Sequence, residues 1–195
     1  MDMVLKALEA CPIVPVLTIH LASEAEALAQ ALVRAGFTVA EVTLRTEAAL
    51  SAIATLRSAE PDLIIGAGTV LDASDIDAAK LAGSQFLVTP ATDAALVGPL
   101  LDCGLPVFPG VATPSEALSL YRQGFTHLKF FPAESNGGVK ALKSIGAPMP
   151  DIKFMPTGGI KAETYKDYLA LPNVVAVGGS WMVNKDSAVT WDYPK

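Results

Sequence analysis

Short apolar runs that end in turn residues recur along the whole chain. Their valine, isoleucine, leucine and phenylalanine residues are nearly continuous rather than alternating with polar ones, which is typical of strands buried on both faces of a parallel sheet. The pattern predicts eight strands, at residues 13–19, 37–44, 63–68, 85–90, 105–110, 127–132, 152–159 and 174–179.

Segments with helical periodicity fill the gaps between these runs. Ser23 and Glu26 have the spacing of a capping box, and Thr113, Pro114 and Glu116 form a second helix start. Helices are therefore expected within residues 23–36, 45–61, 72–83, 92–104, 113–124, 137–146 and 161–171.

Strict alternation of strands and helices predicts an α/β fold with a parallel sheet. Eight such units in residues 1–195, taken as a single domain, favour a small (β/α)8 barrel, the TIM barrel. A doubly wound open sheet is the alternative, and it is disfavoured because no GxGxxG follows the first strand. After residue 183 too few residues follow for a full last helix, so a shortened final helix is expected.

The composition is apolar for a soluble protein, since 51% of the residues are hydrophobic and 17% are charged. This balance suggests that another subunit covers part of the surface. The net charge of −6, without a basic cluster, disfavours nucleic acid and anionic membrane as partners. No run reaches the roughly 18 to 20 apolar residues of a membrane span. Cys11 and Cys103 are predicted to be buried thiols in a reducing cytoplasm.

One lysine stands inside an apolar strand. Lys129 lies between Leu128 and the pair Phe130 and Phe131. Its stem could lie along apolar surface with the ammonium in water. The alternative is a lysine held in a pocket because its amine reacts. In a (β/α)8 barrel, reactive groups lie at the C-terminal ends of the strands, where Lys129 is expected.

Other polar residues gather at predicted strand ends. Period-two alternation places Glu41, Thr43 and Arg45 on one face at the end of the second strand, as residues of a site or of a solvated rim. Thr69 follows the third strand, where it could instead cap a helix. Pro90 ends the fourth strand.

The last two strands end in glycine pairs. Gly158 and Gly159 follow the seventh strand, and Gly179 and Ser180 follow the eighth. The loops at these two barrel positions frequently bind phosphate, although tight turns would explain the glycines equally. His20 and His127 are lone histidines, and for His20, which follows the first strand, a surface or capping role is expected rather than a place in the site.

These residues suit one kind of chemistry. A lysine removed from water, especially near an arginine, has a lowered pKa and is a nucleophile at neutral pH. With a ketone it forms a Schiff base, whose protonated imine accepts the electrons of a breaking C–C bond. A carboxylate can move protons, and an arginine can hold a substrate carboxylate. The set predicts a metal-free aldolase that needs no cofactor and cleaves a phosphorylated keto acid.

Five segments also carry a family resemblance. In order and spacing, "EVTLRTEAAL", "GAGTVL", "KFFPAESNGGVKAL", "PTGGI" and "VGGSW" resemble the motifs of 2-keto-3-deoxy-6-phosphogluconate aldolases, class I enzymes that also act on 4-hydroxy-2-oxoglutarate. The likeness runs from about residue 12 to residue 182. One departure is Ala91 in "TPA", where the family usually has a Pro-Gly pair.

The resemblance implies a role for each matched residue. Lys129 would form the Schiff base and Glu41 would be the general acid/base. Arg45 and Thr69 would bind the pyruvyl carboxylate. The resemblance further implies a cytoplasmic homotrimer of the Entner–Doudoroff route that releases pyruvate and needs no metal.

The remaining matched residues would shape the pocket and hold the far end of the substrate. Pro90 and Phe131 would line the pocket, and Thr157 would contact the substrate hydroxyls. The phosphate would be bound by Gly158, Gly159, Gly179 and Ser180.

Three alternatives stay open at this point. A sibling aldolase for 2-keto-3-deoxy-6-phosphogalactonate is one, although Arg45 in "LRT" favours the gluconate type. A catalytically unused barrel that serves as an oligomeric scaffold is another. A barrel that binds a phosphorylated cofactor such as a flavin would fit the glycine pairs but leaves Lys129 unexplained.

Overall fold

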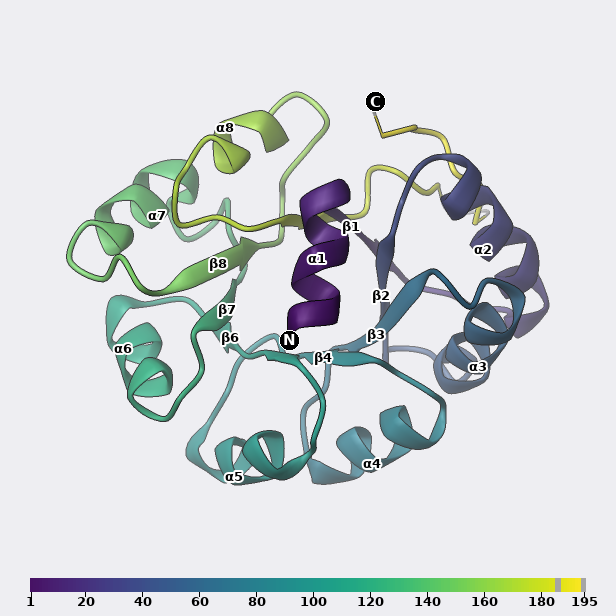
Figure 1. Cartoon of the computed structure of the whole chain (residues 1–195), viewed down its shortest axis with the longest axis horizontal. Helices are drawn as coiled ribbons and strands as arrows, with labels where there is room; N and C mark the ends of the chain where they lie inside the picture. Colours follow the sequence, from purple (N-terminus) through teal and green to yellow (C-terminus); the bar gives the residue numbers. More distant parts are fainter. Residues whose placement is uncertain (185–186, 194–195) are drawn as a thin grey trace.

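The computed structural model describes residues 1–184 and 187–193 as one ring of parallel strands surrounded by helices (Figure 1). The strands are β1 (Ile13–Leu17), β2 (Val39–Thr43), β3 (Ile64–Gly68), β4 (Phe86–Val88), β5 (Val107–Phe108), β6 (Gly110–Val111), β7 (His127–Phe130), β8 (Lys153–Pro156) and β9 (Val177–Gly179). The α-helices are α1 (Asp2–Ala10), α2 (Ala25–Arg34), α3 (Ala49–Ala59), α4 (Ala73–Leu81), α5 (Ala94–Asp102), α6 (Pro114–Arg122), α7 (Gly138–Gly146) and α8 (Tyr165–Leu169).

The strands form two parallel sheets. The larger sheet has the order β5-β4-β3-β2-β1-β9, and the smaller one has the order β6-β7-β8. Pro109 interrupts the predicted fifth strand and divides it into β5 and β6, because proline has no N–H for the ladder. At the other junction, Thr157 after β8 forms a parallel bridge with Gly178 in β9. The result is a curled, barrel-like parallel sheet, which confirms the predicted α/β class.

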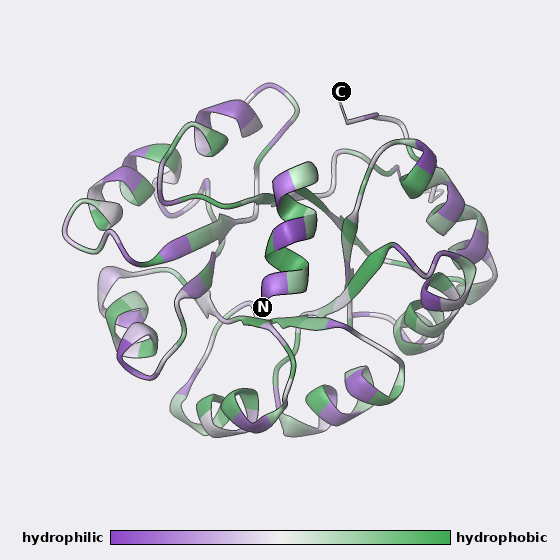
Figure 2. Ribbon diagram, in the orientation of Figure 1, coloured by the Kyte–Doolittle hydropathy of each residue, from purple (hydrophilic) through white to green (hydrophobic). Residues whose placement is uncertain are grey.

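Alternate residues of each strand enter two different cores. One set faces outward and packs against the helices, as Ala40 and Val42 do. The other set faces into the barrel, as Val39 does. Figure 2 shows the resulting contrast between largely hydrophobic strands and helices of mixed hydropathy. This alternation decides which residues reach the interior of the barrel, including those of the site.

The first helix was not predicted. Helix α1 lies over the centre of the ring in Figure 1 and buries Val4 and Leu8 against the first residues of the strands. The Thr38 hydroxyl, just before β2, donates to the Ala7 carbonyl at 2.9 Å. The N-terminal end of the barrel is therefore closed by an apolar plug.

Two expectations about helix ends meet different outcomes. The capping box at Thr113 and Glu116 is confirmed. The one at Ser23 and Glu26 is wrong, because a 3-10 turn, Ala22–Glu24, leads into α2 and no side chain caps it.

The segment after β9 contains no helix at residues 180–184 and 187–193. It has instead an antiparallel bridge between Val183 and Val189, and Trp191 packs against Phe37 with ring centroids 6.1 Å apart. Residues 185–186 and 194–195 lie outside the described part, so the shortened final helix stays a prediction. Within the described residues, no helix is long and apolar enough to cross a membrane.

Candidate active site

A buried ion pair lies inside the barrel. The Nζ atom of Lys129 in β7 donates to Oε1 of Glu41 in β2 at 3.1 Å, across 88 positions of sequence. The two side chains are 5% and 0% exposed. Burial of two charges costs free energy that an apolar pair would not, so the pair is more readily explained by chemistry than by stability. The predicted juxtaposition of Lys129 and Glu41 is found.

Glycine makes the room for this pair. Gly68, the last residue of β3, faces the Glu41 carboxylate so closely that a Cβ atom there would overlap Oε1. The neighbour of Lys129 in β6 is Gly110, which lies against the backbone of Pro90. Gly68 therefore leaves room for the Glu41 carboxylate, whereas Gly110 lets its own strand approach the end of β4.

The Glu41 carboxylate is only partly satisfied. Its Oε2 atom is buried and has no hydrogen-bond partner among the described residues, and the same holds for Thr157 Oγ1. Buried polar atoms normally have partners, so each such atom asks for an explanation. A polar group of a bound substrate would supply one at both places.

Arg45 does not join the ion pair. It lies two residues beyond β2 and is exposed, and its Nη2 donates to Thr18 Oγ1 at 2.9 Å. Arg45 is therefore an arginine at the rim, and its expected role in binding a carboxylate stays a prediction. Glu41 and Thr43 of the same predicted face are buried, and only Arg45 is solvated.

Thr69 and Pro90 follow neighbouring strands. Thr69 is half-buried and has a positive φ of 60°, a backbone conformation that a β-branched residue rarely adopts. Its expected alternative role as a helix cap is wrong, because Asp72 caps α4. Such strain tends to persist at functional sites, which is consistent with a binding role for Thr69.

Phe131 lies beside Lys129. Its ring centroid is 5.2 Å from Lys129 Nζ, close enough for a cation–π contact. Phe131 and Pro90 also line a hollow of about 500 Å³, together with Glu116. Thr157 lies at the end of β8, where Gly178 must be glycine because a Cβ atom would overlap Thr157 Oγ1.

The loop with Gly158 and Gly159 is braced by Glu134. The Glu134 N–H donates to the Gly158 carbonyl at 3.0 Å, and a Cβ at Gly159 would come within 2.8 Å of the Glu134 side chain. Both glycines have positive φ. The buried Tyr168 of α8 donates to Glu134 Oε1. Burial is the larger cause that raises the pKa of Tyr168, and the hydrogen bond to Glu134 raises it further.

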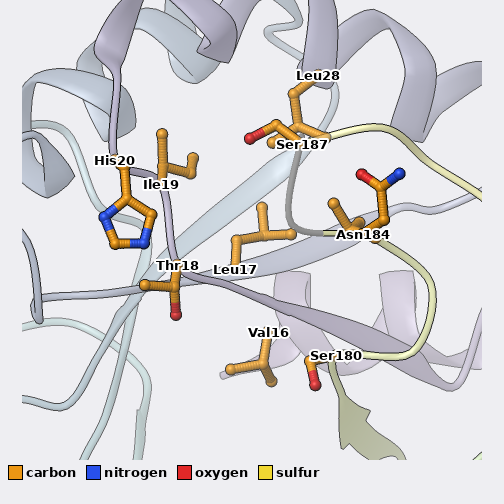
Figure 3. A pocket seen from close by; sticks show the side chains of 10 residues that line it. Val16, Leu17, Thr18, Ile19, His20, Leu28, Ser180, Asn184 and Ser187 are labelled. Carbon is orange, nitrogen blue, oxygen red and sulfur yellow. The ribbon is translucent and has the colours of Figure 1, made fainter.

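Ser180, which directly follows Gly179, borders a hollow of about 710 Å³ (Figure 3). Its wall includes Thr18 and His20 after β1, with Ser180 after β9. His20 is exposed, as predicted for a lone histidine. The predicted phosphate residues thus fall into two loops, after β8 and at the end of β9, at the same end of the barrel.

The described residues contain no group of three histidine, cysteine, aspartate or glutamate side chains that could hold a metal ion. What the site offers is an amine and a carboxylate in contact inside a barrel, with an arginine, a threonine and glycine loops at the mouth. An amine with an adjacent carboxylate can attack a carbonyl and exchange the protons of that reaction.

Comparison with known proteins shows the family of this chain. The family model "Aldolase: KDPG and KHG aldolase" matches residues 4–195. The chain belongs to the KDPG and KHG aldolase family. The family predicted from the sequence motifs is thereby confirmed.

The relatives match nearly the whole chain. The 2-dehydro-3-deoxy-phosphogluconate aldolase of Pseudoalteromonas atlantica is 46% identical and covers 94% of this chain and 86% of its own. The KHG/KDPG aldolase of Escherichia coli K12 is 42% identical, with the same coverage of 94% and 86%.

A solved structure adds chemistry to the likeness. The KDPG aldolase of Legionella pneumophila, captured with pyruvate as a covalent carbinolamine intermediate, has a TM-score of 0.90 and 40% identity, over 96% of this chain and 90% of that chain. A carbinolamine is the adduct of an amine and a carbonyl, the first product expected of a Schiff-base enzyme.

Sequence reasoning missed three contributors to the site. Thr18 and Tyr168 carry no motif of their own, because their roles depend on strand and helix neighbours far away in sequence. Gly68 had a signal, since it faces the same side as Glu41 in the neighbouring strand, but the reason for a glycine there needs the position of Glu41.

Proposed function

We propose that this protein is a class I aldolase that cleaves 2-keto-3-deoxy-6-phosphogluconate to pyruvate and glyceraldehyde 3-phosphate. The observation that carries the proposal is the buried contact of 3.1 Å between Lys129 and Glu41 in a chain of the KDPG and KHG aldolase family. Among the described residues it joins a potential nucleophile to a potential proton carrier, at a place where water is excluded.

The reaction uses the two side chains in turn. Glu41 accepts the proton of the Lys129 amine, which then attacks the C2 carbonyl of the substrate. Glu41 returns this proton to the hydroxyl group that leaves as water, so the carbinolamine becomes a protonated imine and Glu41 is a carboxylate again. Glu41 removes the proton of the C4 hydroxyl, the C3–C4 bond breaks, and its electrons move into the imine to give an enamine. Glyceraldehyde 3-phosphate leaves, and Glu41 gives the proton that it took from the C4 hydroxyl to C3 of the enamine. Water then hydrolyses the resulting imine and frees pyruvate and the Lys129 amine.

The residues at the mouth bind the two ends of the substrate. Arg45 and Thr69 hold the pyruvyl carboxylate, since a guanidinium binds a carboxylate through two parallel N–H groups. Thr157 donates to a substrate hydroxyl, which would satisfy its buried Oγ1. Pro90 and Phe131 form the apolar wall. The phosphate is bound by Gly158, Gly159, Gly179 and Ser180.

Borohydride reduction in the presence of pyruvate tests the lysine. The reductant converts the imine to a stable amine, and peptide mass spectrometry is expected to find the adduct on Lys129. Lys129→Arg should abolish the adduct. Lys153→Arg is the matched control, because Lys153 in β8 donates to the Pro150 and Pro172 carbonyls instead. An adduct on Lys153 or Lys161 in the unmodified protein would refute the assignment.

The substrate range needs separate assays. Cleavage of 4-hydroxy-2-oxoglutarate to pyruvate and glyoxylate is expected as a second activity, because it needs the carboxylate and lysine sites but no phosphate loop. The galactonate-type substrate differs at C4, so the cleavage rates of the two epimers compare the gluconate and galactonate types directly. Assembly without any turnover would instead favour the scaffold.

The proposal extends to the whole protein. Residues 1–195 would form one (β/α)8 barrel domain, working as a homotrimer in the cytoplasm. Large exposed hydrophobic residues support burial by another subunit, among them Leu71, Leu81 and Leu101, which are 61%, 91% and 50% exposed. Sedimentation equilibrium of the purified protein tests the trimer.

A further inference from the structure

Two threonine hydroxyls and one guanidinium form a chain of hydrogen bonds at the junction of β1 and β2. Arg45 Nη2 donates to Thr18 Oγ1 at 2.9 Å, and Thr18 Oγ1 lies 3.2 Å from Thr43 Oγ1. Thr43 Oγ1 in turn donates to the Leu17 carbonyl at 2.9 Å. The chain therefore runs from the exposed rim to a threonine that is only 2% exposed.

Donor counting fixes the direction of every bond in this chain. A threonine hydroxyl has one hydrogen. Thr43 uses its hydrogen on the Leu17 carbonyl, so between the two threonines Thr18 must donate and Thr43 must accept. Thr18 thus has no hydrogen left for a substrate, and its oxygen accepts the hydrogen of Arg45. In such a series each bond polarises the next and strengthens it.

The arrangement limits the freedom of an exposed arginine. A free arginine side chain loses up to about 2 kcal/mol of rotamer entropy when a ligand orders it. One N–H group of Arg45 is bound to Thr18, and a guanidinium has five, so two parallel ones remain for a carboxylate. Thr18 also lines the hollow that Ser180 borders (Figure 3). Arg45 is therefore anchored to a residue in the wall of this hollow.

We propose that Thr18 is a positioning residue that holds Arg45 ready for the carboxylate of the substrate. Thr43 is the buried base of this device, because its bond to the Leu17 carbonyl fixes the threonine pair to β1. The inference rests on the proposed function, in which Arg45 binds the pyruvyl carboxylate. Thr18 itself does not touch the reacting atoms.

Thr18→Val tests the proposal with a side chain of nearly the same shape. Loss of the acceptor should raise KM roughly two- to fivefold, the low end for a hydrogen bond because this one is exposed. The value of kcat should stay unchanged, because the carboxylate is held equally in ground state and transition state. Thr18→Ser keeps the hydroxyl and should restore the KM of the unmodified protein.

A double-mutant cycle separates positioning from simple stability. In an Arg45→Gln background, Thr18→Val should have no further effect on KM, whereas a merely structural threonine would act in both backgrounds. Thr38→Val is the matched control, because Thr38 loses an equivalent bond to the Ala7 carbonyl at the opposite end of the barrel. It should lower the thermal midpoint and leave KM unchanged.

The outcomes distinguish the inference from the proposed function. If Arg45→Gln raises KM but Thr18→Val does not, the role of Thr18 is refuted and that of Arg45 stands. A fall in KM for Thr18→Val would also refute it, because Thr18 would then compete with the substrate for Arg45. If Arg45→Gln leaves KM unchanged, both the inference and the proposed carboxylate site fail.

Discussion

The two ends of the barrel are built from the same strands but in opposite ways. At the N-terminal end, inward residues such as Val39 and Phe86 are large and apolar, and α1 presses Leu8 against them. Farther along, the inward positions hold Glu41 and Lys129, with glycine on neighbouring strands. The N-terminal end is filled with apolar side chains, whereas the interior nearer the C-terminal end holds a buried charged pair.

The two ends contribute differently to the stability of the fold. The plug removes apolar surface from water, which stabilises the barrel. The charged pair lost its hydration and is held in place by its mutual attraction. We expect substitutions at the plug to act on unfolding, and those around the pair to act on chemistry, with the pair itself affecting both.

The largest effect is expected from breaking the charged pair. Lys129→Met leaves the Glu41 carboxylate buried without its partner, which should lower the free energy of unfolding by about 3–5 kcal/mol. Urea unfolding measures the loss. Adding Glu41→Leu to the same chain should recover most of it, because an apolar pair needs no hydration. A single variant as stable as the unmodified protein would contradict the view that both charges are fully buried.

Next in size is a cavity at the plug. Leu8 is 2% exposed, and Leu8→Ala should lower the free energy of unfolding by about 3 kcal/mol. Lys129 should still be labelled by borohydride and pyruvate, since the opposite end is unchanged. Lys6→Ala, on the exposed face of the same helix, is the control and should change stability by less than about 0.5 kcal/mol. Loss of labelling in Leu8→Ala would mean that the two ends are not independent.

The two ends also differ in how far they can be predicted from sequence. The apolar runs and their turn signals predicted the positions of the strands and the α/β class, and the motifs around Lys129 and Glu41 predicted that the two residues meet. Helix α1 escaped prediction because its apolar positions become meaningful only beside the strand ends that they cover. The exposure of Arg45 could not be predicted from period-two alternation, because Arg45 lies beyond the end of β2 at Thr43. Contacts between residues distant in sequence, such as Thr18 with Arg45, leave no local pattern.

Substitutions at two glycines of β3 allow a direct comparison of the two ends. A Cβ at Gly68 would overlap Glu41 Oε1, whereas one at Gly66 would overlap the Phe86 ring of the apolar end. Gly68→Ala should displace the carboxylate and lower kcat roughly 100-fold, because such small misplacements are costly in catalysis. Gly66→Ala should mainly reduce stability, by about 1–3 kcal/mol from overpacking. Steady-state kinetics with urea unfolding of both variants tests this, and equal effects on kcat would remove the distinction.

The smallest effect concerns pH and the apolar end. Burial, with a further contribution from the charge of Lys153, lowers the pKa of His127 at the start of β7. As pH falls through about 6.5, the unfolded chain takes up this proton before the folded one does, so the free energy of unfolding falls. His127→Gln should flatten that part of the stability profile, measured by urea unfolding from neutral to mildly acidic pH. An unchanged slope would show that the histidine accepts its proton in the folded barrel as readily as in the unfolded chain.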